Sequence, residues 1–580
     1  MTIIKQFWCL IDSKDKIKFF LIISFTILQV LLEMIGIAAA IPFVTILINP
    51  EIISEFLIKY NFSNTIEIVN FYKKDELLLI SCLIFFSIFL IKNILIVITN
   101  KIISNFVFSF RTKLFSKLLN KILNQEYIFF VKKNVTQIFN TLFSEVNIYA
   151  VYIVIPLITI FSELIIAFGI FVLIVSLGNI NGIFLIIPIV FVVILILKKM
   201  NKNIKIWSEE RILINEKILK NNFEFFIGIK EIIIFGQINK IYNIYNNLMK
   251  SLEKIDFKNK IIVSYPKIFL EQAVILVFIM IIIILSKSNI EEQRILVIVS
   301  FYLAAAYRLL PSINKISVSY QHLKQGKPSI PKVMDLYNIQ LNDNDNIQII
   351  SNDKFQFKNQ IIFENINFGY SKQKKIIENF NLELKKNTII GFSGESGTGK
   401  STLVNIISSL IIPEKGKIFL DDLEINNIQK IKKYRNLFCI TSQDSFLLDA
   451  TIKENIIYGS DEIFSQNKIN QALEFSNLNQ MIKELPNGLD TQLGLNIKNI
   501  SSGQKQRIAL ARSFYSNREI LIYDEATNAL DQKNEKVIIE NIKKLKNKTI
   551  IMISHNQENL GICDKIYFFK GNKLVEYKKY

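Results

Sequence analysis

The sequence predicts a multidomain fold, in which an all-α domain with six transmembrane helices precedes an α/β domain built around a phosphate-binding loop (P-loop). The 580-residue chain is 51% apolar and has a mean hydropathy of +0.33, which is unusual for a wholly soluble protein. Long apolar stretches occupy the first part of the chain, whereas short strand-like runs alternate with helical patterns from about residue 340. We therefore expect a transmembrane domain over residues 1–320, a linker over 321–345 and an α/β domain over 346–580.

Six apolar stretches define the predicted membrane domain. Four exceed the roughly 20 helical residues that cross a bilayer, and two reach this length with their polar flanks. The first has no small-residue cleavage site, so we expect an uncleaved span. The segments 99–147 and 198–260 are patterned as helices, so the helices should extend past the bilayer and turn back through short surface helices. The stretches are 19–48, 77–98, 148–175, 182–197, 261–285 and 295–310.

The charge distribution predicts the orientation of these helices. Net charge is +19, from 69 Lys and Arg against 50 Asp and Glu. In a soluble protein this excess favours nucleic-acid binding, but in a membrane protein it accompanies cytoplasmic loops. The segments near 99–147 and 198–260 carry most of these cations, so we expect both termini in the cytoplasm and no nucleic-acid partner. The four cysteines lie far apart, which excludes a disulfide framework and a cysteine zinc site.

A glycine-rich segment matches the phosphate-binding loop pattern G-x-x-x-x-G-K-[ST]. It follows a predicted strand at 388–392 and precedes a predicted helix at 402–410, which is the context that the mechanism requires. Backbone N–H groups of such a loop form an anion nest, and the helix N-terminus adds its dipole. Lys400 is expected to reach the β- and γ-phosphates, and Ser401 to ligate Mg²⁺. The loop residues are Gly394, Glu395, Ser396, Gly397, Thr398, Gly399, Lys400, Ser401 and Thr402.

A second motif is an apolar strand, 520–523, that ends in Asp524 and Glu525. A buried strand of this kind delivers carboxylates to the edge of a parallel sheet. Asp524 is expected to hold Mg²⁺ and Glu525 to orient the attacking water. Between the two motifs, small residues at 501–503 begin a predicted helix at 505–513, which also suits a phosphate.

The order of these motifs resembles the ATPase domain of ABC transporters, and the whole chain resembles an exporter-type half-transporter. The resemblance implies ATP and Mg²⁺ as cofactors and a dimer that sandwiches ATP. It implies that Tyr370 stacks on adenine, that Gln443 senses Mg²⁺, and that His555 contacts the γ-phosphate. Ser501, Gly503 and Gln504 match the family signature that binds ATP across the dimer.

Three departures from the family pattern leave the dimer partner open. Ser502 stands where the signature usually has glycine, and Asn528 replaces a usual serine. The preceding loop, with Leu495 and Ile497, lacks its usual acidic residue. Half-transporters with altered signatures often pair with a different subunit, so a heterodimer is the alternative to a homodimer. Glu525 and His555 match the pattern, so an active ATPase is expected.

Charged side chains within the spans are candidates for substrate contact, because they are expensive in a bilayer. The alternative is that some lie near membrane ends and reach the interface. Three cations, Lys92, Lys267 and Arg308, could supply a site for an anionic group. The charged residues in the apolar stretches are Glu33, Lys92, Glu163, Lys267, Glu271 and Arg308.

The membrane half resembles lipid-linked oligosaccharide flippases of the PglK type, in the stretches 307–314 and 266–271 and around Glu33 and Pro42. This resemblance implies a homodimer in the bacterial inner membrane that moves an undecaprenyl-pyrophosphate glycan. It also implies a short outer helix between the first two spans. Ile52, Ile53, Phe56, Leu57 and Tyr60 have one-face helical spacing there and could hold a polyprenyl tail.

Two other functions remain open from the sequence. The chain could export another lipid, a drug or a peptide, because ATPase motifs do not identify cargo. It could also be an ATP-gated regulator or channel, which the altered signature allows and Glu525 disfavours.

Overall fold

The computed structural model describes residues 3–39, 43–46, 74–177, 183–286, 292–339, 355–370, 375–395, 397–460, 464–493, 500–570 and 573–577, with backbone alone at 183–202 and a few other positions. The chain divides into two compact units. A helical unit contains Met1–Gln125 and Lys133–Leu341, and a C-terminal unit contains Glu126–Lys132 and Asn342–Tyr580.

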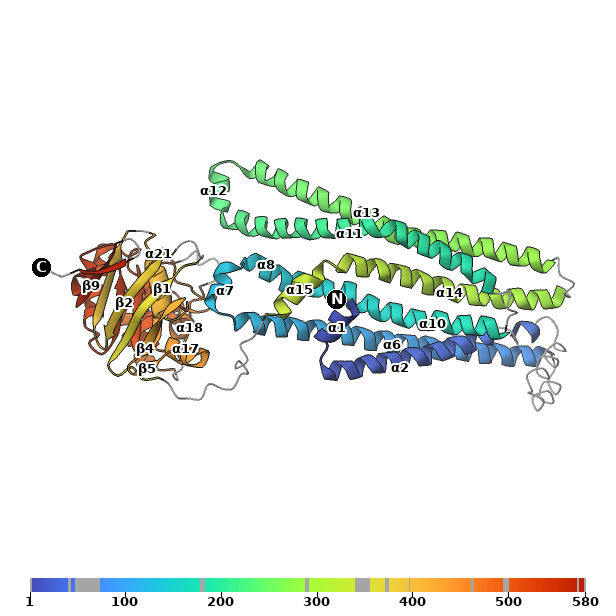
Figure 1. Ribbon diagram of the computed structural model, residues 1–580, viewed down its shortest axis with the longest axis horizontal. Helices are drawn as coiled ribbons and strands as arrows, with labels where there is room; N and C mark the ends of the chain where they lie inside the picture. Colours follow the sequence, from blue (N-terminus) through green and yellow to red (C-terminus); the bar gives the residue numbers. More distant parts are fainter. Residues whose placement is uncertain are drawn as a thin grey trace. The chain divides into compact units, whose positions relative to one another are not determined.

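The helical unit consists of long helices joined by short ones (Figure 1). Helix α6 has 50 residues and is about 75 Å long at 1.5 Å per residue, more than twice the hydrocarbon core of a bilayer. This helix is therefore longer than a bilayer crossing requires, and short helices lie at the turns between the long ones. The helices are α1 (Ile3–Leu10), α2 (Ser13–Ala38), α6 (Lys74–Leu123), α8 (Val135–Asn140), α9 (Val146–Tyr149), α10 (Ile155–Leu177), α11 (Ile183–Ile227), α12 (Ile229–Ile234), α13 (Ile238–Ser286), α14 (Glu292–Gly326) and α15 (Ser329–Tyr337), with π-helical turns η2 (Thr141–Glu145) and η3 (Ala150–Val154).

Five helical segments in the described part of the chain are long and apolar enough to cross a membrane: Ser13–Ile46, Asp75–Leu123, Val135–Ser176, Ile238–Met280 and Ile295–Gly326. They include three of the six predicted stretches in full and most of two others, 19–48 and 261–285. The sixth, 182–197, is helical from Ile183 within α11, and its side chains lie outside the described residues. The predicted outer helix at 52–60 and Pro42 also lie outside them.

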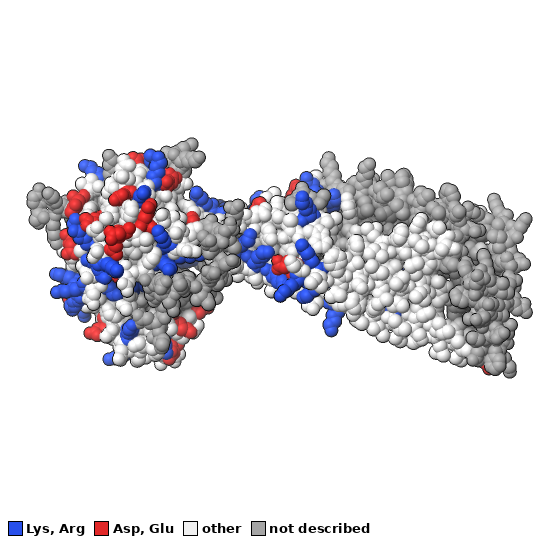
Figure 2. All heavy atoms as spheres, turned by 60° about the horizontal axis from the view of Figure 1, so that its bottom comes forward, with Lys and Arg blue, Asp and Glu red and all other residues white. Residues whose placement is uncertain are grey.

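The surface of the helical unit separates charged from uncharged regions. Figure 2 shows Lys and Arg, with some Asp and Glu among them, gathered at one end of this unit, while uncharged residues cover most of the rest of the described surface in that view. An uncharged band beside a cationic end is the pattern expected of helices that cross a bilayer and continue into the cytoplasm.

Helices α2, α10 and α14 share an apolar core that includes Val30, Ile170 and Phe301. Helix α10 approaches α2 closely at Gly169, where a Cβ atom would lie 2.7 Å from Val30 Cγ1. Only the smallest residue allows this approach, so α2 and α10 form a tightly packed pair.

Part of the predicted linker, 321–345, is packed helix. Helix α14 continues to Gly326, and α15 then buries Ile330, Val333 and Leu336 in the helical unit. The three apolar residues lie at spacings of three on one helix face, which drives this packing.

The C-terminal unit contains two sheets. The larger has the order β10-β9-β3-β8-β7-β6, with β10 antiparallel and the other pairs parallel, and the smaller has the antiparallel order β2-β1-β4-β5. The strands of the larger sheet are β3 (Ile389–Gly394), β6 (Phe438–Ser442), β7 (Ile520–Asp524), β8 (Thr549–Ile553), β9 (Lys565–Lys570) and β10 (Lys573–Tyr577). Those of the smaller are β1 (Gln360–Phe368), β2 (Ile377–Lys385), β4 (Lys415–Leu420) and β5 (Leu423–Glu424).

Helices of the C-terminal unit pack around these sheets. The predicted strands at 388–392 and 520–523 are confirmed as β3 and β7, and the helix at 505–513 lies within α21. The helix predicted to reach residue 410 ends earlier, because Ser409 has a left-handed φ of 54°. The helices are α7 (Tyr127–Lys132), α16 (Lys400–Ile407), α17 (Ile428–Arg435), α18 (Ile452–Ile457), α19 (Gln466–Phe475), α20 (Asn479–Glu484), α21 (Ser502–Tyr515) and α22 (Gln532–Lys543).

Asp421 anchors the start of β1, since its carboxylate accepts hydrogen bonds from the backbone N–H groups of Lys358, Asn359 and Gln360 at 2.7–3.0 Å. Burial raises the pKa of Asp421, but these three donors outweigh it, so the pKa lies below its ordinary value. The carboxylate therefore stabilises the folded state above its unfolded pKa, and this contribution is lost as pH falls through the lower folded pKa.

We predict that Asp421→Ala destabilises the C-terminal unit by about 0.5–1.5 kcal/mol at pH 7, because three backbone N–H groups at the start of β1 lose their charged acceptor to water. Thermal unfolding at a series of pH values would measure this effect. The difference from wild type should shrink below about pH 4, where the wild-type carboxylate becomes protonated. An unchanged transition at pH 7 would contradict the assigned role.

Candidate functional site

The phosphate-binding loop connects β3 to α16, as the sequence predicts. Gly394 and Gly399 have φ angles of 153° and 102°, which side chains with a Cβ rarely adopt. A Cβ would also lie 2.8 Å from Phe569 Cβ at the first glycine and 2.7 Å from Ile376 Cγ2 at the second. Both glycines are therefore required by the fold, and the loop wraps the N-terminus of α16. Ser396 lies outside the described residues.

Lys400 begins α16 and is buried beneath the loop. Its Nζ donates to the carbonyl oxygens of Gly394 at 2.7 Å and Glu395 at 3.0 Å, and lies 3.2 Å from His555 Nε2. Burial lowers the pKa of Lys400, while the nearby carboxylates of Glu525 and Asp524 raise it. The cation thus lies where the loop, the acids and the histidine converge.

Glu525 follows the last residue of β7 and has a left-handed φ of 52°. This backbone conformation is uncommon for glutamate and typical of functional sites. The Oε1 atom lies 3.0 Å from His555 Nε2, and Oε2 accepts a hydrogen bond from Asn528 Nδ2 at 2.8 Å. Asn528, which departs from the family pattern, therefore orients the carboxylate.

Asp524 lies beside Ser401, whose side chain forms a hydrogen bond with its carboxylate. Burial and the neighbouring Glu525 raise the pKa of Asp524, while Ser401 and Lys400 lower it. No group of three or more His, Cys, Asp or Glu that could hold a metal lies in the described part of the chain. A hydroxyl and a carboxylate that leave the remaining ligand positions to phosphates and water fit Mg²⁺.

Tyr370 lies at the side of α16. Its hydroxyl is 3.4 Å from Thr402 Oγ1, and its ring packs edge-on against Phe368 at 5.1 Å between centroids. The half-buried ring is thus held near the phosphate-binding loop by β1, at a position from which it could stack on a base.

Gln506 joins three predicted site segments, although it belongs to none of the motifs that the sequence shows. Its Nε2 donates to the carbonyl oxygen of Gln443 at 3.4 Å, and its Oε1 accepts from the backbone N–H of Ala529 at 3.0 Å. The side chain is 1% exposed. A glutamine at the start of the predicted helix does not by itself indicate a functional role, because its hydrogen-bond partners belong to loops that are distant in the sequence.

The signature residues begin α21. Ser501 caps the helix by accepting from the N–H of Gln504, whose Oε1 accepts in turn from the N–H of Ser501 at 2.8 Å. A Cβ on Gly503 would lie 2.8 Å from the carbonyl oxygen of Ala529. Ser502 is exposed, so its extra atoms are accommodated within this chain. The loop with Leu495 and Ile497 lies outside the described residues.

The three predicted substrate cations have different surroundings. Arg308 pairs with Glu33 at 2.7 Å, and Lys92 of α6 interacts electrostatically with both while its Nζ lies 4.2 Å from the Phe89 ring centroid. Lys267 instead pairs with Glu271 on the same helix at 3.8 Å, with both side chains about half exposed. Arg308 and Lys92 are therefore near each other, and Lys267 forms a separate pair.

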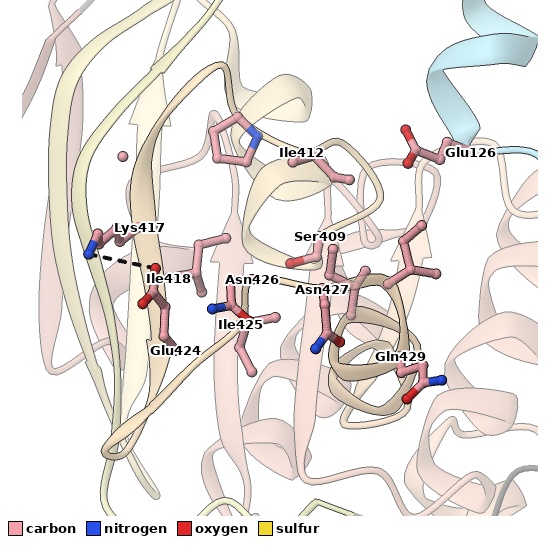
Figure 3. Close-up of a pocket in the computed structure, with 14 residues that line it drawn as sticks. Glu126, Ser409, Ile412, Lys417, Ile418, Glu424, Ile425, Asn426, Asn427 and Gln429 are labelled. Carbon is pink, nitrogen blue, oxygen red and sulfur yellow. Dashed lines mark ion pairs between the residues drawn. The ribbon is translucent and has the colours of Figure 1, made fainter. Parts of the chain in front are cut away.

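A cavity of about 680 Å³ lies in the C-terminal unit, apart from the phosphate-binding loop (Figure 3). Ser409, Ile418, Ile425 and Asn427 line it, and Glu126 lies at its border. The Lys417–Glu424 ion pair, at 3.7 Å, spans one side. Its lining residues include none of the predicted nucleotide contacts.

Comparisons with the sequences of known proteins also indicate a nucleotide-binding unit in the C-terminal part of the chain. Residues 377–528 match the family model described as "ABC transporter". The chain is 32% identical over 277 residues to the heterocyst differentiation ATP-binding protein HepA of Nostoc, covering 47% of this chain and 44% of that protein. It is 35% identical over 219 residues to the ATP-dependent lipid A-core flippase of Neisseria gonorrhoeae, covering 37% of this chain and 35% of the flippase. The chain thus spans less than half the length of these curated relatives.

The fold is matched over nearly the whole chain. A structure of a bacterial Atm1-family ABC exporter with ATP bound superposes with a TM-score of 0.77 at 18% identity, covering 96% of this chain and 94% of that one. The predicted fold class is therefore confirmed: a helical membrane unit of exporter type followed by an α/β P-loop unit.

We predict that Asp524→Asn stabilises the nucleotide-free protein at pH 7 by about 2–4 °C in thermal midpoint. A carboxyl whose pKa is raised in the folded state lowers stability progressively as pH rises above its unfolded pKa, and the amide removes this effect. Thermal unfolding without nucleotide would measure the shift, which should vanish below about pH 4. A lower midpoint at pH 7 would mean that the carboxylate is a net stabilising group.

Proposed function

We propose that this chain is an ATP-driven translocase of the ABC exporter type, which moves a lipid-linked oligosaccharide across the bacterial inner membrane. The ATPase part of this proposal is supported by the contacts of His555, whose Nε2 lies 3.2 Å from Lys400 Nζ and 3.0 Å from Glu525 Oε1. The fold, which matches that of an ABC exporter, also supports it. In this proposal both termini and the C-terminal unit are cytoplasmic, as the distribution of Lys and Arg favours.

The residues of the site suit ATP hydrolysis. Lys400 and the glycine loop would hold the phosphates, Tyr370 would stack on adenine, and Ser401, Asp524 and Gln443 would hold Mg²⁺. Bound Mg²⁺ would neutralise phosphate charge. Glu525, oriented by Asn528 and His555, would position the attacking water and accept its proton.

A second copy of the chain is the partner that we propose. Helix α12 lies at the turn between α11 and α13, and the apolar residues around it are strongly exposed in the single chain: Phe226, Ile227, Ile234 and Phe235, at 67–81%. Such a patch marks a protein contact. A dimer would also bring Ser501, Gly503 and Gln504 to the ATP of the other copy. A heterodimer remains the alternative, since Ser502 departs from the signature.

The cargo that we propose is an undecaprenyl-pyrophosphate glycan, as in flippases of the PglK type. An apolar groove of about 470 Å³ runs along α6, lined by residues that include Phe86, Phe89 and Ile94. Lys92 lies over the Phe89 ring, so an anionic headgroup and an apolar tail would both find partners on this helix. Arg308 and Lys267 are further proposed contacts of the pyrophosphate. That some relatives are lipid A-core flippases supports lipid cargo in general.

Export of another lipid, a drug or a peptide is the second candidate function. The exporter fold supports it equally, because the fold does not identify the cargo. The third candidate, an ATP-gated regulator or channel, is disfavoured because Glu525 is oriented by two neighbours as hydrolysis would require.

We predict that Glu525→Gln lowers ATP hydrolysis by at least about 10²-fold while ATP binding persists, because the carboxylate acts on water. Lys400→Ala should instead weaken ATP binding. Steady-state hydrolysis and equilibrium binding of the nucleotide, measured on the purified protein, separate the two effects. A wild-type hydrolysis rate in Glu525→Gln would show that the acidic strand has been misassigned.

We predict that Ser502→Gly raises hydrolysis by a few-fold in a verified homodimer, because the Cβ stands where ATP of the other copy would approach. Hydrolysis should also require dimers, which dilution in detergent would test. An unchanged rate in a homodimer would show that Ser502 is tolerated and would remove the motive for a heterodimer.

We predict that proteoliposomes containing the protein flip an undecaprenyl-pyrophosphate oligosaccharide in an ATP-dependent manner, and that Lys400→Ala abolishes this flipping. A lipid A-type lipid and a neutral dye-labelled lipid serve as competing cargoes. Flipping of either competitor with no movement of the oligosaccharide would favour the second candidate function.

A further inference from the structure

A charge network crosses the apolar core of the helical unit. Arg308 of α14 lies between Glu33 of α2 and Glu163 of α10, and Lys315 of α14 pairs with Glu163 at 2.6 Å. The side chains of the two glutamates are 3% and 5% exposed, and that of Arg308 is 15% exposed. The charges of these two cations and two carboxylates sum to zero, before Lys92 of the neighbouring α6 is counted.

The two carboxylates hold Arg308 unequally. Arg308 Nε donates to Glu33 Oε2 at 2.7 Å, and Nη1 donates to Ser312 Oγ at 3.1 Å. Nη2 lies 3.7 Å from Glu163 Oε2, beyond hydrogen-bond distance, and this buried oxygen has no hydrogen-bond partner. The contact with Glu33 is therefore the strong one, and the Nη2 edge of the guanidinium is the weak side.

Glu163 has a second cation that would keep it paired if Arg308 were engaged elsewhere. Its Oε1 accepts a hydrogen bond from Lys315 at 2.6 Å. Removing a partner from a buried charge is strongly unfavourable unless another partner remains. Glu163 meets that condition, so the Nη2 edge can exchange this carboxylate for another anion.

We propose that Glu163 is a displaceable counter-ion, which occupies the Nη2 edge of Arg308 until a phosphate group of the lipid headgroup replaces it. Glu33 is the positioning residue that keeps the guanidinium fixed during the exchange. This inference rests on the proposed function, since it requires an anionic lipid as cargo. Lys92, which interacts electrostatically with Glu33 and Arg308, adds a cation to the same region.

The exchange would make the site selective for anions. A phosphate can replace a carboxylate at a guanidinium, because both present oxygens that match its fork. An uncharged headgroup cannot replace the carboxylate, because it would interact with the Nη2 edge of Arg308 no more strongly than Glu163 does. The network would thus discriminate between polyprenyl pyrophosphates and neutral lipids of equal tail length.

The experiment measures binding of undecaprenyl pyrophosphate to the full-length protein in phosphatidylcholine nanodiscs without ATP. Glu163→Gln should tighten the apparent dissociation constant by about tenfold, because it removes a charged competitor for the same donor. Glu33→Gln should weaken it, because Arg308 loses its anchor. Binding of undecaprenol, which has the same tail and no charge, should not respond to Glu163→Gln. Glu209→Gln, in the exposed Lys205–Glu209 pair of α11, is the matched control.

Thermal midpoints distinguish the exchange from a purely structural role. Both glutamine variants should lower the midpoint, whereas their dissociation constants should move in opposite directions. Adding Arg308→Ala to Glu163→Gln should remove the tightening. Glu163→Asp, which shortens the side chain by one methylene and so moves the carboxylate away from Arg308, should give a smaller gain in affinity. This variant replaces Glu163→Gln in the experiment if the glutamine variant does not fold.

Saturable binding that Glu163→Gln leaves unchanged or weakens would overturn this inference and leave the proposed cargo standing. Equal tightening by Glu33→Gln would also overturn it, because the two carboxylates would then be equivalent. Absence of saturable binding in wild type and in every variant would overturn both the cargo proposal and this inference.

Discussion

The candidate nucleotide site depends on one constraint, that neighbouring parallel strands end at the same edge of a sheet. Strands β3, β8 and β7 are adjacent in the larger sheet, and each is followed directly by a segment that carries a site residue. Lys400 follows β3, His555 follows β8 and Glu525 follows β7. Lys400 and His555, which are 155 positions apart, therefore meet at 3.2 Å, and Glu525 lies 3.0 Å from the same histidine. Burial of the apolar strands holds them there.

Much of this arrangement could be predicted from the sequence, because its signals are local. The glycines of the loop, the apolar run before Asp524 and the helix after Ser501 each reflect a backbone requirement of their own segment. The contacts of Asn528 and Gln506 could not be predicted this way. Their partners are Glu525 in one case and two separate loops in the other, so their roles depend on how the segments pack.

The membrane half was harder to predict for a physical reason. The sequence identifies a charged residue within a span, whose transfer into a bilayer costs free energy, but the residue of opposite charge that pairs with it belongs to another helix. The sequence identifies Arg308 as a candidate contact of an anionic group, and the structure adds that Glu33, Glu163 and Ser312 surround it. Likewise, the sequence predicts a linker over 321–345 that continues the last helix and becomes polar from residue 342. The structure adds that the apolar face of α15 packs within the helical unit, which extends to Leu341.

The short helix α7 belongs to the C-terminal unit, although the chain encodes it in the middle of the helical unit. Ile128 packs against the main core of the C-terminal unit, and Glu126 interacts electrostatically with Arg435 of α17. This unit is therefore discontinuous in sequence. A fragment that begins at residue 342 would lack the helix that covers this part of its core. A gene rearrangement that exchanged the C-terminal unit would have to preserve the surface that α7 contacts, so the two parts of the gene that encode this unit are expected to evolve together.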